Sequence, residues 1–584
     1  MAVGAGGPED RRTDRFVGSS VRRFVGSSVR RFVAAQPPRT PDFGPNVTVF
    51  DPTTPAATVQ RTLDTIFASQ ESSEFGARRY AVLFMPGTYD VDARIGFYTQ
   101  VSGLGMSPDD VVINGGMRAD ARWRKGNATL NFWRVVENMS VVPAGGFNRW
   151  AVSQAAPMRR MHIRGDLVLD DGGWSSGGFL ADSRVDGQVR SGSQQQWLTR
   201  NSAIGEWKGA NWNMVFVGTE HAPANSFPDP PYTRIDSAPL IREKPFLFVD
   251  ARGAWRVFVP ALRASAAGTT WASGRPAGAA RPLSDFVIVK PGASAAAMND
   301  ALTRGKSLII TPGVYHLDTP LHIVRRNTIV LGLGLATLVA DGGVSAIVVD
   351  DVDGTTLAGL LVEAGPVESP VLVQIGAPGA AVRHSSNPTL LSDLFVRVGG
   401  AGVGKATRSL EINSNDVIGD HLWLWRADHG DGVGWTSNTA ANGLVVNGSD
   451  VTMYGLFVEH YQEDQVRWAG NRGRTYMFQN EMPYDVPGQT EWMSGTTRGF
   501  AAYRVDDGVT RHEAWGLGSY CFFNRNPDVV AERAFQAPVG AGVRLRNMLT
   551  VSLGGGRGTI AHVINQSGPA AQKGATVQKL VSGP

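Results

Sequence analysis

The amino-acid sequence contains one structural unit twice, and this duplication restricts the possible folds more than any other feature. The segments "VLFMPGTYDVDARIGFYTQVSGLG" (82–105) and "LIITPGVYHLDTPLHIVRRNTIVLGLG" (308–334) each read as an apolar strand, a Pro-Gly-x-Tyr turn, a second strand and Gly-Leu-Gly. Pro86 and Pro312 are 226 residues apart, as are Glu137 and Glu363. A helix-like segment precedes each copy, at 56–70 and 295–305. The sequence therefore predicts two diverged copies of one module.

Each copy continues as a series of short β-branched strands separated by Gly, Asn or Asp. Long helical periods are missing after the opening helix-like segment. Closely spaced strands joined by turns of a few polar residues are typical of a parallel β-helix, in which each coil buries its inner face against the next coil. We therefore predict an all-β fold of two tandem right-handed parallel β-helices packed side by side. A sandwich or a propeller is the structural alternative, and the Pro-Gly-x-Tyr spacing favours the solenoid.

Composition suggests where the modules begin and end. The chain has 584 residues, more than one ordinary domain requires. An Ala-, Gly- and Pro-rich stretch, 264–282, has the composition of a linker. We predict a low-complexity extension at 1–40, a first module at 41–260, a linker at 261–282 and a second module at 283–584 that carries the catalytic acid.

The positive charge of the chain is confined to its first 40 residues. They contain eight Arg and three acids, together with two copies of "RFVGSSVR", whereas the whole chain carries a net charge of only +4. The remainder is therefore close to neutral at −1, which argues against a nucleic-acid groove and against acidic substrates. No apolar segment resembles a signal peptide or a membrane span. The single cysteine, Cys521, excludes an internal disulfide framework and is predicted to be a buried small hydrophobe.

Several familiar catalytic motifs fail on inspection. The segment "GGAGVGKA" (399–406) approaches a phosphate-binding loop, but Ala406 replaces the Ser or Thr that would hold magnesium. The ten histidines show no zinc-binding spacing, and no Gly-x-Ser-x-Gly elbow occurs. We therefore predict no nucleotide site and no metal site.

Aromatic and acidic residues are concentrated between positions 420 and 495. In "GDHLWLWRADHG" (419–430), strand alternation sends Leu and Trp to opposite faces before Asp428 and His429. Exposed rings beside carboxylates are the usual construction of a sugar-binding site. Trp468 and Trp492, in Gly-rich segments, are candidates for sugar contact, whereas Trp197 is either a core residue or a substrate platform. Asp428 and His429 are alternatively a turn cap.

These segments resemble glycoside hydrolase family 55, the β-1,3-glucanases or laminarinases. The resemblance covers most of residues 42–555 and is densest in "QQQWLTRNS", "WNMVFVG", "WLWRADHG", "NGLVVNGSDVTMYGLFVEH" and "GRTYMFQNEMPYD". It implies two β-helices sharing one cleft, exo-acting hydrolysis of β-glucan with inversion, no cofactor, a monomer, and a secreted or periplasmic protein.

The resemblance also implies roles for individual residues. Glu481 falls on the general acid, and Glu459 on a second carboxylate close to the reacting centre. Gln195 or Gln196 would hold the attacking water, and Thr219 would contribute to the same water site. The substrate-binding candidates are Tyr484, Trp468, Trp425, Asp428, His429, His460, Trp492, Thr219 and Trp197.

The surroundings of Glu481 suit a proton donor on physical grounds. An unperturbed Glu, with a pKa of ~4.3, would be ionised at neutral pH. Apolar neighbours disfavour the ionised form, and Tyr476, Phe478, Met482 and Tyr484 supply them. Glu481 is alternatively a buried structural acid, and Glu459 alternatively pairs with Arg467 or Arg474.

Two other functions remain open from the sequence alone. A polysaccharide lyase on a β-helix would need a calcium-binding Asp cluster and a Lys or Arg base, and the acids here do not cluster in that way. A non-catalytic carbohydrate-binding or structural β-helix would bind without turnover.

Overall fold

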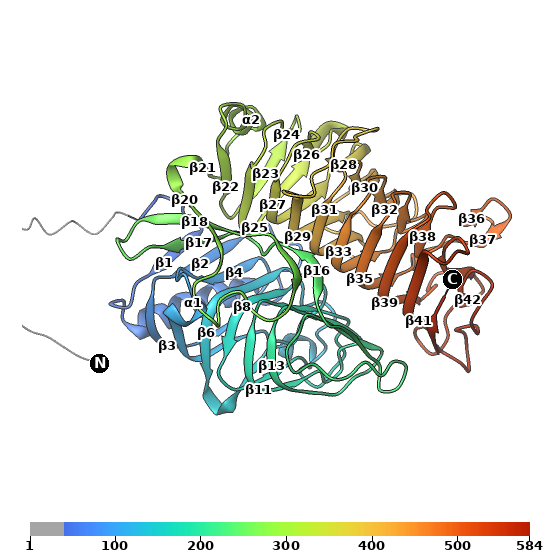
Figure 1. Ribbon diagram of the computed structural model, residues 1–584, viewed down its shortest axis with the longest axis horizontal. Helices are drawn as coiled ribbons and strands as arrows, with labels where there is room; N and C mark the ends of the chain where they lie inside the picture. The colour runs from blue at the N-terminus through green and yellow to red at the C-terminus, as the bar shows by residue number, and fades with distance from the viewer. Residues whose placement is uncertain (1–39, 584) are drawn as a thin grey trace, which may run out of the picture. The chain divides into compact units, whose positions relative to one another are not determined.

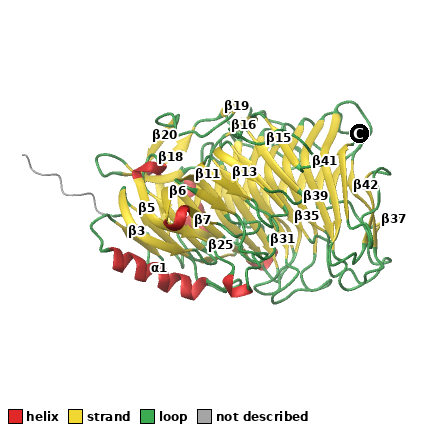
Figure 2. Ribbon diagram, turned by 90° about the horizontal axis from the view of Figure 1, so that it is seen from below, coloured by secondary structure: helices red, strands yellow, loops and turns green. Residues whose placement is uncertain are grey.

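A computed structural model describes residues 40–583, and the predicted extension at 1–40 lies almost wholly outside that range. Nearly all regular structure is β, and the strands stack in two parallel β-helices (Figure 1). The strands run side by side along each stack, while helix α1 (Ala56–Gln70) lies at the margin of the first (Figure 2). Both stacks belong to one compact unit that begins at Thr40.

The first β-helix is built on one large sheet whose strands pair in parallel. Its main path consists of β1 (Val47–Phe50), β2 (Tyr80–Phe84), β4 (Thr99–Gly103), β6 (Arg134–Pro143), β8 (Pro157–Ile163), β10 (Phe179–Ala181), β12 (Gln196–Arg200), β14 (Asn213–Val217) and β15 (Tyr232–Ile235). The other face comprises β3 (Gly87–Arg94), β5 (Val111–Arg118), β7 (Phe147–Arg149), β9 (Asp166–Val168), β11 (Arg184–Arg190) and β13 (Ala203–Lys208).

The second β-helix has two long sheets. The sheet that faces the first β-helix contains β21 (Phe286–Val289), β22 (Ser307–Ile310), β25 (Ile329–Ala340), β27 (Thr356–Ala364), β29 (Thr389–Val398), β31 (Val417–Arg426), β33 (Thr452–Glu459), β35 (Gly473–Glu481), β39 (His512–Cys521), β41 (Val543–Ser552) and β43 (Val577–Ser582). The outer sheet contains β24 (Leu321–Ile323), β26 (Ile347–Val349), β28 (Ser369–Ile375), β30 (Ala406–Ile412), β32 (Ala440–Val446), β34 (Val466–Trp468), β38 (Tyr503–Val505), β40 (Val530–Gln536) and β42 (Thr559–Ile564).

The internal duplication is confirmed down to individual hydrogen bonds. The predicted helices are α1 and α2 (Ala295–Thr303), each at the start of its β-helix. The hydroxyl of Tyr89 donates to the carbonyls of Met85 and Phe50. The hydroxyl of Tyr315 donates in the same way to the carbonyls of Thr311 and Val289. Each Pro-Gly-x-Tyr turn is therefore closed by its tyrosine.

Strand alternation separates the core of a coil from the surface between the two β-helices. On β31, Leu422 and Leu424 point into the core of the second β-helix. Trp423 and Trp425 point the other way, into an apolar cluster that also contains Phe132 and other side chains of the first β-helix. The same alternation repeats on β33 and β35, so alternate residues of these strands face the first β-helix.

A buried network of charges crosses this apolar contact. Arg159 of β8 donates to Asp393 at 2.7 Å and to Asp420 at 2.7 Å, and Arg200 of β12 donates to Asp420 at 2.9 Å. Arg200 also pairs with Glu243 at 2.7 Å. Such pairs need a fixed geometry to offset the desolvation of their charges, and they define how the two β-helices meet.

Between the β-helices, the chain forms small antiparallel sheets. β17 (Phe246–Val249) pairs with β18 (Trp255–Pro260), which pairs with β20 (Gly278–Pro282), and β16 (Ala238–Ile241) pairs with β19 (Arg263–Ala266). The stretch predicted to be a linker therefore contains strands that pair back on preceding ones.

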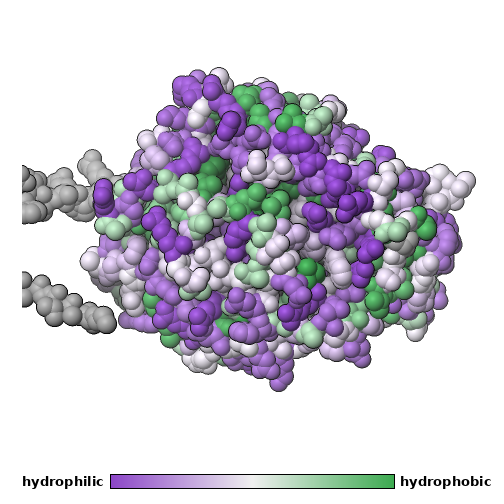
Figure 3. Space-filling model, viewed as in Figure 1, coloured by the Kyte–Doolittle hydropathy of each residue, from purple (hydrophilic) through white to green (hydrophobic). Residues whose placement is uncertain are grey.

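Exposed turns and buried cores differ clearly in polarity. Hydrophilic side chains cover much of the face seen in Figure 3, with smaller hydrophobic areas between them.

Cys521 is buried, as predicted. Across residues 40–583, no helix has the length and apolarity required to cross a membrane.

Candidate active site

Four side chains line up at the C-terminal ends of neighbouring strands of the sheet that faces the first β-helix. In the strand register, Trp425 is opposite Glu459, Glu459 is opposite Glu481, and Glu481 is opposite Tyr520. Neighbouring strands lie about 4.8 Å apart, so the two glutamates are direct neighbours. Each glutamate lies two positions after a strand residue that faces the first β-helix. Its own side chain therefore also points toward the first β-helix.

Glu459 is the more deeply buried carboxylate, with 3% of its surface exposed. Its Oε1 accepts a hydrogen bond from Gln154 Nε2 at 3.0 Å, and its Oε2 accepts one from Trp423 Nε1 at 2.8 Å. Burial and the charge of Glu481 raise the pKa of Glu459 well above its usual range, although both hydrogen bonds favour the ionised form. The alternative pairing with Arg467 or Arg474 is wrong, because these two bind Asp506 and Glu513.

Glu481 is more accessible, with 15% of its side chain exposed. Its Oε2 accepts a hydrogen bond from the hydroxyl of Tyr484, and His460 Nε2 lies 3.8 Å away. Burial raises the pKa of Glu481 and the charge of Asp428 adds to this, while His460 and the Tyr484 hydroxyl oppose it. A carboxyl group with a raised pKa and an accessible oxygen can hold a proton and deliver it to a ligand.

Asp428 and His429 connect this site to the first β-helix. His429 Nδ1 lies 2.8 Å from Asp428 Oδ1, and its Nε2 lies 2.6 Å from Oε1 of Glu74, in the loop after α1. Burial lowers the pKa of His429, but the two carboxylates raise it more, to about 10. Burial raises the pKa of Asp428, but His460 and His429 lower it more, to about 2. The two carboxylates therefore favour the protonated form of His429.

His460 lies between the carboxylates of Asp428 and Glu481. Its Nδ1 is 3.1 Å from the carbonyl of Met482, which can only accept, so Nδ1 carries a proton. Its Nε2 lies 3.8 Å from both Asp428 and Glu481. The ring also packs edge-on against Tyr484, with centroids 4.4 Å apart. His460 thus fixes the position of Tyr484 and faces Glu481.

A row of polar side chains on the first β-helix faces the two glutamates. Continuing the register of β8, β10 and β12 places Gln154, Ser176 and Gln195 at the same position of three successive coils. Ser176 Oγ donates to Gln154 Oε1 at 3.1 Å, and Gln154 in turn donates to Glu459. The backbone N–H of Gln195 donates to the carbonyl of Ser175 at 3.1 Å.

The two glutamines predicted to hold water differ in their free hydrogen-bonding capacity. Gln196 Nε2 donates to the carbonyls of Phe478 at 3.2 Å and Gly516 at 3.3 Å, and its Oε1 accepts from Tyr520. In contrast, Oε1 of Gln195 is buried and has no hydrogen-bond partner within residues 40–583. Gln195 therefore has an acceptor to offer, whereas Gln196 is occupied in joining the two β-helices.

Five residues predicted to bind substrate are placed where they cannot do so. The four predicted tryptophans are at most 1% exposed, and their rings lie inside apolar clusters: Trp197, Trp425, Trp468 and Trp492. Thr219 is also buried and donates to the carbonyl of Thr199 at 2.9 Å. Thr199 is three residues beyond Gln196, about 10 Å along β12, so Thr219 is separated from the predicted water site. These positions argue against the predicted contacts, and for Trp197 they agree with the alternative of a core residue.

Other aromatic rings are better placed than the predicted tryptophans. Phe522 is half-buried and packs edge-on against Tyr484, with centroids 5.2 Å apart. Trp212 is half-buried and its ring packs against Tyr520, with centroids 4.7 Å apart, while its backbone N–H donates to the carbonyl of Gln195. Neither "CFF" nor "ANWN" adjoins a residue predicted to be catalytic, so the sequence offers no local signal for these two rings.

Acidic side chains do not converge on a metal anywhere in the part of the chain that the structure describes. No group of three or more His, Cys, Asp or Glu side chains there is arranged to hold a metal ion.

The site combines paired carboxylates, polar side chains that can bind water, and half-buried rings, and it lies between two parallel β-helices. This combination is typical of proteins that process polysaccharides.

Comparison with known proteins identifies the family. Residues 286–481 match the model of the LAM55 pectate lyase-like domain. The chain is 54% identical over 543 residues to an exo-beta-1,3-glucanase of Streptomyces sp. strain SirexAA-E, covering 92% of this chain and 89% of that protein. The solved structure of sacteLam55A from the same organism superposes with a TM-score of 0.92 at 54% identity, covering 93% of this chain and 99% of that one.

A second solved structure shows a variant of sacteLam55A, with a glutamate replaced by alanine, in complex with glucose. It matches with a TM-score of 0.92 at 53% identity, over 93% of this chain and 99% of that one. The chain described here belongs to glycoside hydrolase family 55.

Proposed function

We propose that this protein is an exo-acting hydrolase of β-1,3-glucan that inverts the configuration of the anomeric carbon. The observation that carries the proposal is the direct register of Glu459 with Glu481, on a surface that faces a second β-helix. The 54% identical exo-beta-1,3-glucanase supports the linkage and the exo action. The proposed division into modules 41–260 and 283–584 puts both glutamates in the second module, with the substrate bound in a cleft between the two.

Glu481 is the proton donor in this proposal. The raised pKa favours the protonated form of Glu481, and the exposed part of the side chain can reach a glycosidic oxygen. Two neighbouring carboxyl groups resist ionising together, which also favours one proton on the pair. The proton passes from Glu481 to the leaving oxygen as the C1–O bond breaks.

The attacking water lies near Gln195 and Ser176 on the opposite side. The unpaired Oε1 of Gln195 can accept one of its hydrogens, and Ser176 Oγ has a free acceptor site. An amide or a hydroxyl cannot take up the proton that water releases. Glu459 is the carboxylate that receives it, and Gln154 only orients that carboxylate. Attack from the face opposite the leaving group gives the α-anomer.

Substrate contacts come from the half-buried groups around Glu481. Tyr484 and Phe522 present ring surface beside the donor, and Trp212 does so beside Gln195. Asp428 and His429 are each partly exposed. Asp428 can accept hydrogen bonds from sugar hydroxyls, and His429 can donate hydrogen bonds to them. We expect the protein to act as a monomer.

The test is hydrolysis of β-1,3-, β-1,4-, β-1,6- and β-1,2-linked glucans, with products read by size and anomeric form. We expect α-glucose from β-1,3-glucan, and a loss of about 10²–10⁴-fold or more in kcat for Glu481→Gln. The control is Glu206→Gln, an exposed glutamate on β13. Products that absorb in the ultraviolet would indicate a lyase, and binding without turnover would indicate a non-catalytic protein. Release of β-glucose would contradict inversion.

A further inference from the structure

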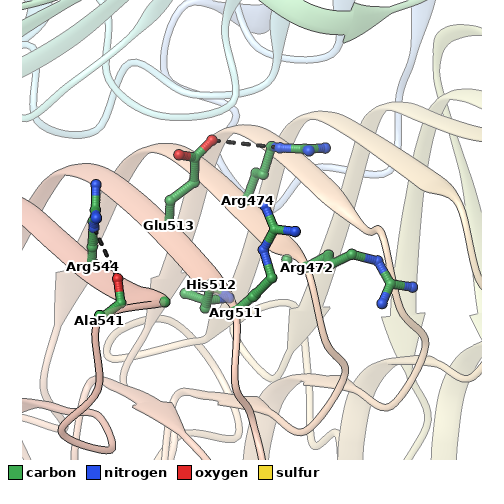
Figure 4. Close-up of a pocket in the computed structure, with 9 residues that line it drawn as sticks. Arg472, Arg474, Arg511, His512, Glu513, Ala541 and Arg544 are labelled. Carbon is green, nitrogen blue, oxygen red and sulfur yellow. Dashed lines mark hydrogen bonds and ion pairs between the residues drawn. The ribbon is translucent and has the colours of Figure 1, made fainter.

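A basic cavity of about 460 Å³ lies at the N-terminal ends of β35, β39 and β41, where no function has been assigned. Arg472, Arg474, Arg511 and Arg544 line it, together with Glu513 and backbone of the intervening turns. Figure 4 shows Arg474, Glu513 and Arg544 extending to the same side from neighbouring strands. Eight residues of β35, about 26 Å of extended strand, separate its start from Glu481. The cavity is therefore separate from the candidate active site.

The charges in this cavity are only partly balanced. Arg472 pairs with Asp450 at 2.6 Å, and Arg474 lies 3.4 Å from Glu513, which also accepts from Tyr476. Arg511 and Arg544 are exposed, and neither has a carboxylate within 4.0 Å in the described part of the chain. Arg544 Nε donates to the carbonyl of Ala541 at 3.1 Å, which fixes its direction and leaves its terminal N–H groups free.

Two uncompensated guanidinium groups face the opening of this cavity. Residues beyond position 40 carry a net charge of −1, so the positive charge here is local. Guanidinium groups bind tetrahedral oxyanions through paired N–H bonds. Arg511, just before β39, and Arg544, on β41, line one opening and can hold one such group from two sides. The volume exceeds that of a bare phosphate and leaves room for the molecule that carries it.

We propose that this cavity binds a phosphate or sulfate group, with Arg511 and Arg544 as the principal ligands and Arg474 released from Glu513 to assist. The proposal does not depend on the hydrolytic function. Free phosphate and a phosphate or sulfate ester on a polymer share this chemistry, and the experiment below separates them. Binding weakens as salt rises, because both partners are charged and accessible.

The test uses the full chain and calorimetric titration with inorganic phosphate, polyphosphate, dextran sulfate and uncharged dextran. We expect at least one anion to bind, uncharged dextran not to bind, and Arg511→Gln/Arg544→Gln to weaken binding about tenfold or more. The control double variant Arg252→Gln/Arg275→Gln removes the same charge from other exposed positions. The arginines of residues 1–39 are present in every variant, so their contribution to anion binding is the same in each and does not affect the comparison.

The outcomes separate the sources of the anion. Binding of inorganic phosphate assigns the site to a free ion, whereas binding of polyphosphate or dextran sulfate alone assigns it to a polymer. Arg511→Lys/Arg544→Lys keeps the charge and is expected to restore part of the affinity. Equal binding by the Gln double variant and its control, or no binding of any anion by the unaltered protein, would overturn the proposal. Hydrolysis of β-1,3-glucan is expected to be the same in all these variants.

Discussion

Replacing Tyr484 by Phe removes one hydrogen bond from Glu481 and should move the pH profile in a predictable direction. The Tyr484 hydroxyl donates to Glu481 Oε2, and this bond favours the ionised carboxylate. Its loss therefore raises the pKa of Glu481. A hydrogen bond to a charged group contributes about 1.5–3 kcal/mol. At 1.36 kcal/mol per pKa unit, this corresponds to about 1–2 units, and a water that replaces the hydroxyl reduces it to about one unit.

The assay is the pH dependence of kcat/KM for a β-1,3-linked glucose oligosaccharide. The alkaline limb reports loss of the proton from the acid in the free enzyme, so it should move upward by about one unit in Tyr484→Phe. The other charged groups that face Glu481 are unchanged by the substitution: Glu459, Asp428, His429 and His460. Tyr476→Phe is the matched control, because that hydroxyl donates at 2.8 Å to Glu513 at the far end of the strands. An alkaline limb that stays in place or moves downward would refute the reasoning.

Three further predictions concern the contact between the β-helices. Asp420→Asn leaves Arg159 and Arg200 buried without their shared anion and should cost about 3–5 kcal/mol in denaturant unfolding, against about 0–1 kcal/mol for the exposed Asp236→Asn. Burial raises the pKa of Glu243, but Arg200 lowers it more, to about 2, so its stabilisation is complete above its usual pKa of 4.5 and is lost as pH falls toward 2. The stability difference between the unaltered protein and Glu243→Gln should shrink across that window, and a constant difference would contradict this assignment. Gly177→Ala places a Cβ 2.2 Å from Gln479 Oε1 and should cost about 1–3 kcal/mol, whereas the same change at the open Gly379, where φ is positive, tests backbone strain alone.

The sequence predicted those features that depend on local periodicity. Short strands and turns specify coils, and alternation specifies which residues face inward, so Leu422 and Leu424 could be assigned to one face and Trp423 to the other. The spacing of 22 residues between Glu459 and Glu481 equals one coil, and it therefore brings the two carboxylates into register. A solenoid converts equal sequence spacing into spatial adjacency, whereas the roles of the two glutamates were implied by the family resemblance.

The parts of the site that come from the first β-helix could not be predicted in this way. Gln154 contacts Glu459 across 305 residues of sequence, and Glu74 contacts His429 across 355. No periodicity within either module encodes how the two modules dock. Docking depends on complementary shape and on buried charges such as Arg159 with Asp393, and these have no local pattern.

The tryptophan predictions were wrong for a reason that is visible in the neighbouring glycines. Gly-rich segments were interpreted as exposed turns, so Trp468 and Trp492 were expected to face a sugar. In the structure, a Cβ on Gly473 would lie 2.3 Å from the ring of Trp468, and one on Gly499 would lie 2.6 Å from the ring of Trp492. These glycines make space for a buried indole, and a large ring in a narrow coil requires a missing side chain beside it. In a solenoid of this width, a glycine near a tryptophan therefore indicates burial of the ring, whereas a ring beyond the end of its strand, such as Phe522, stays partly exposed.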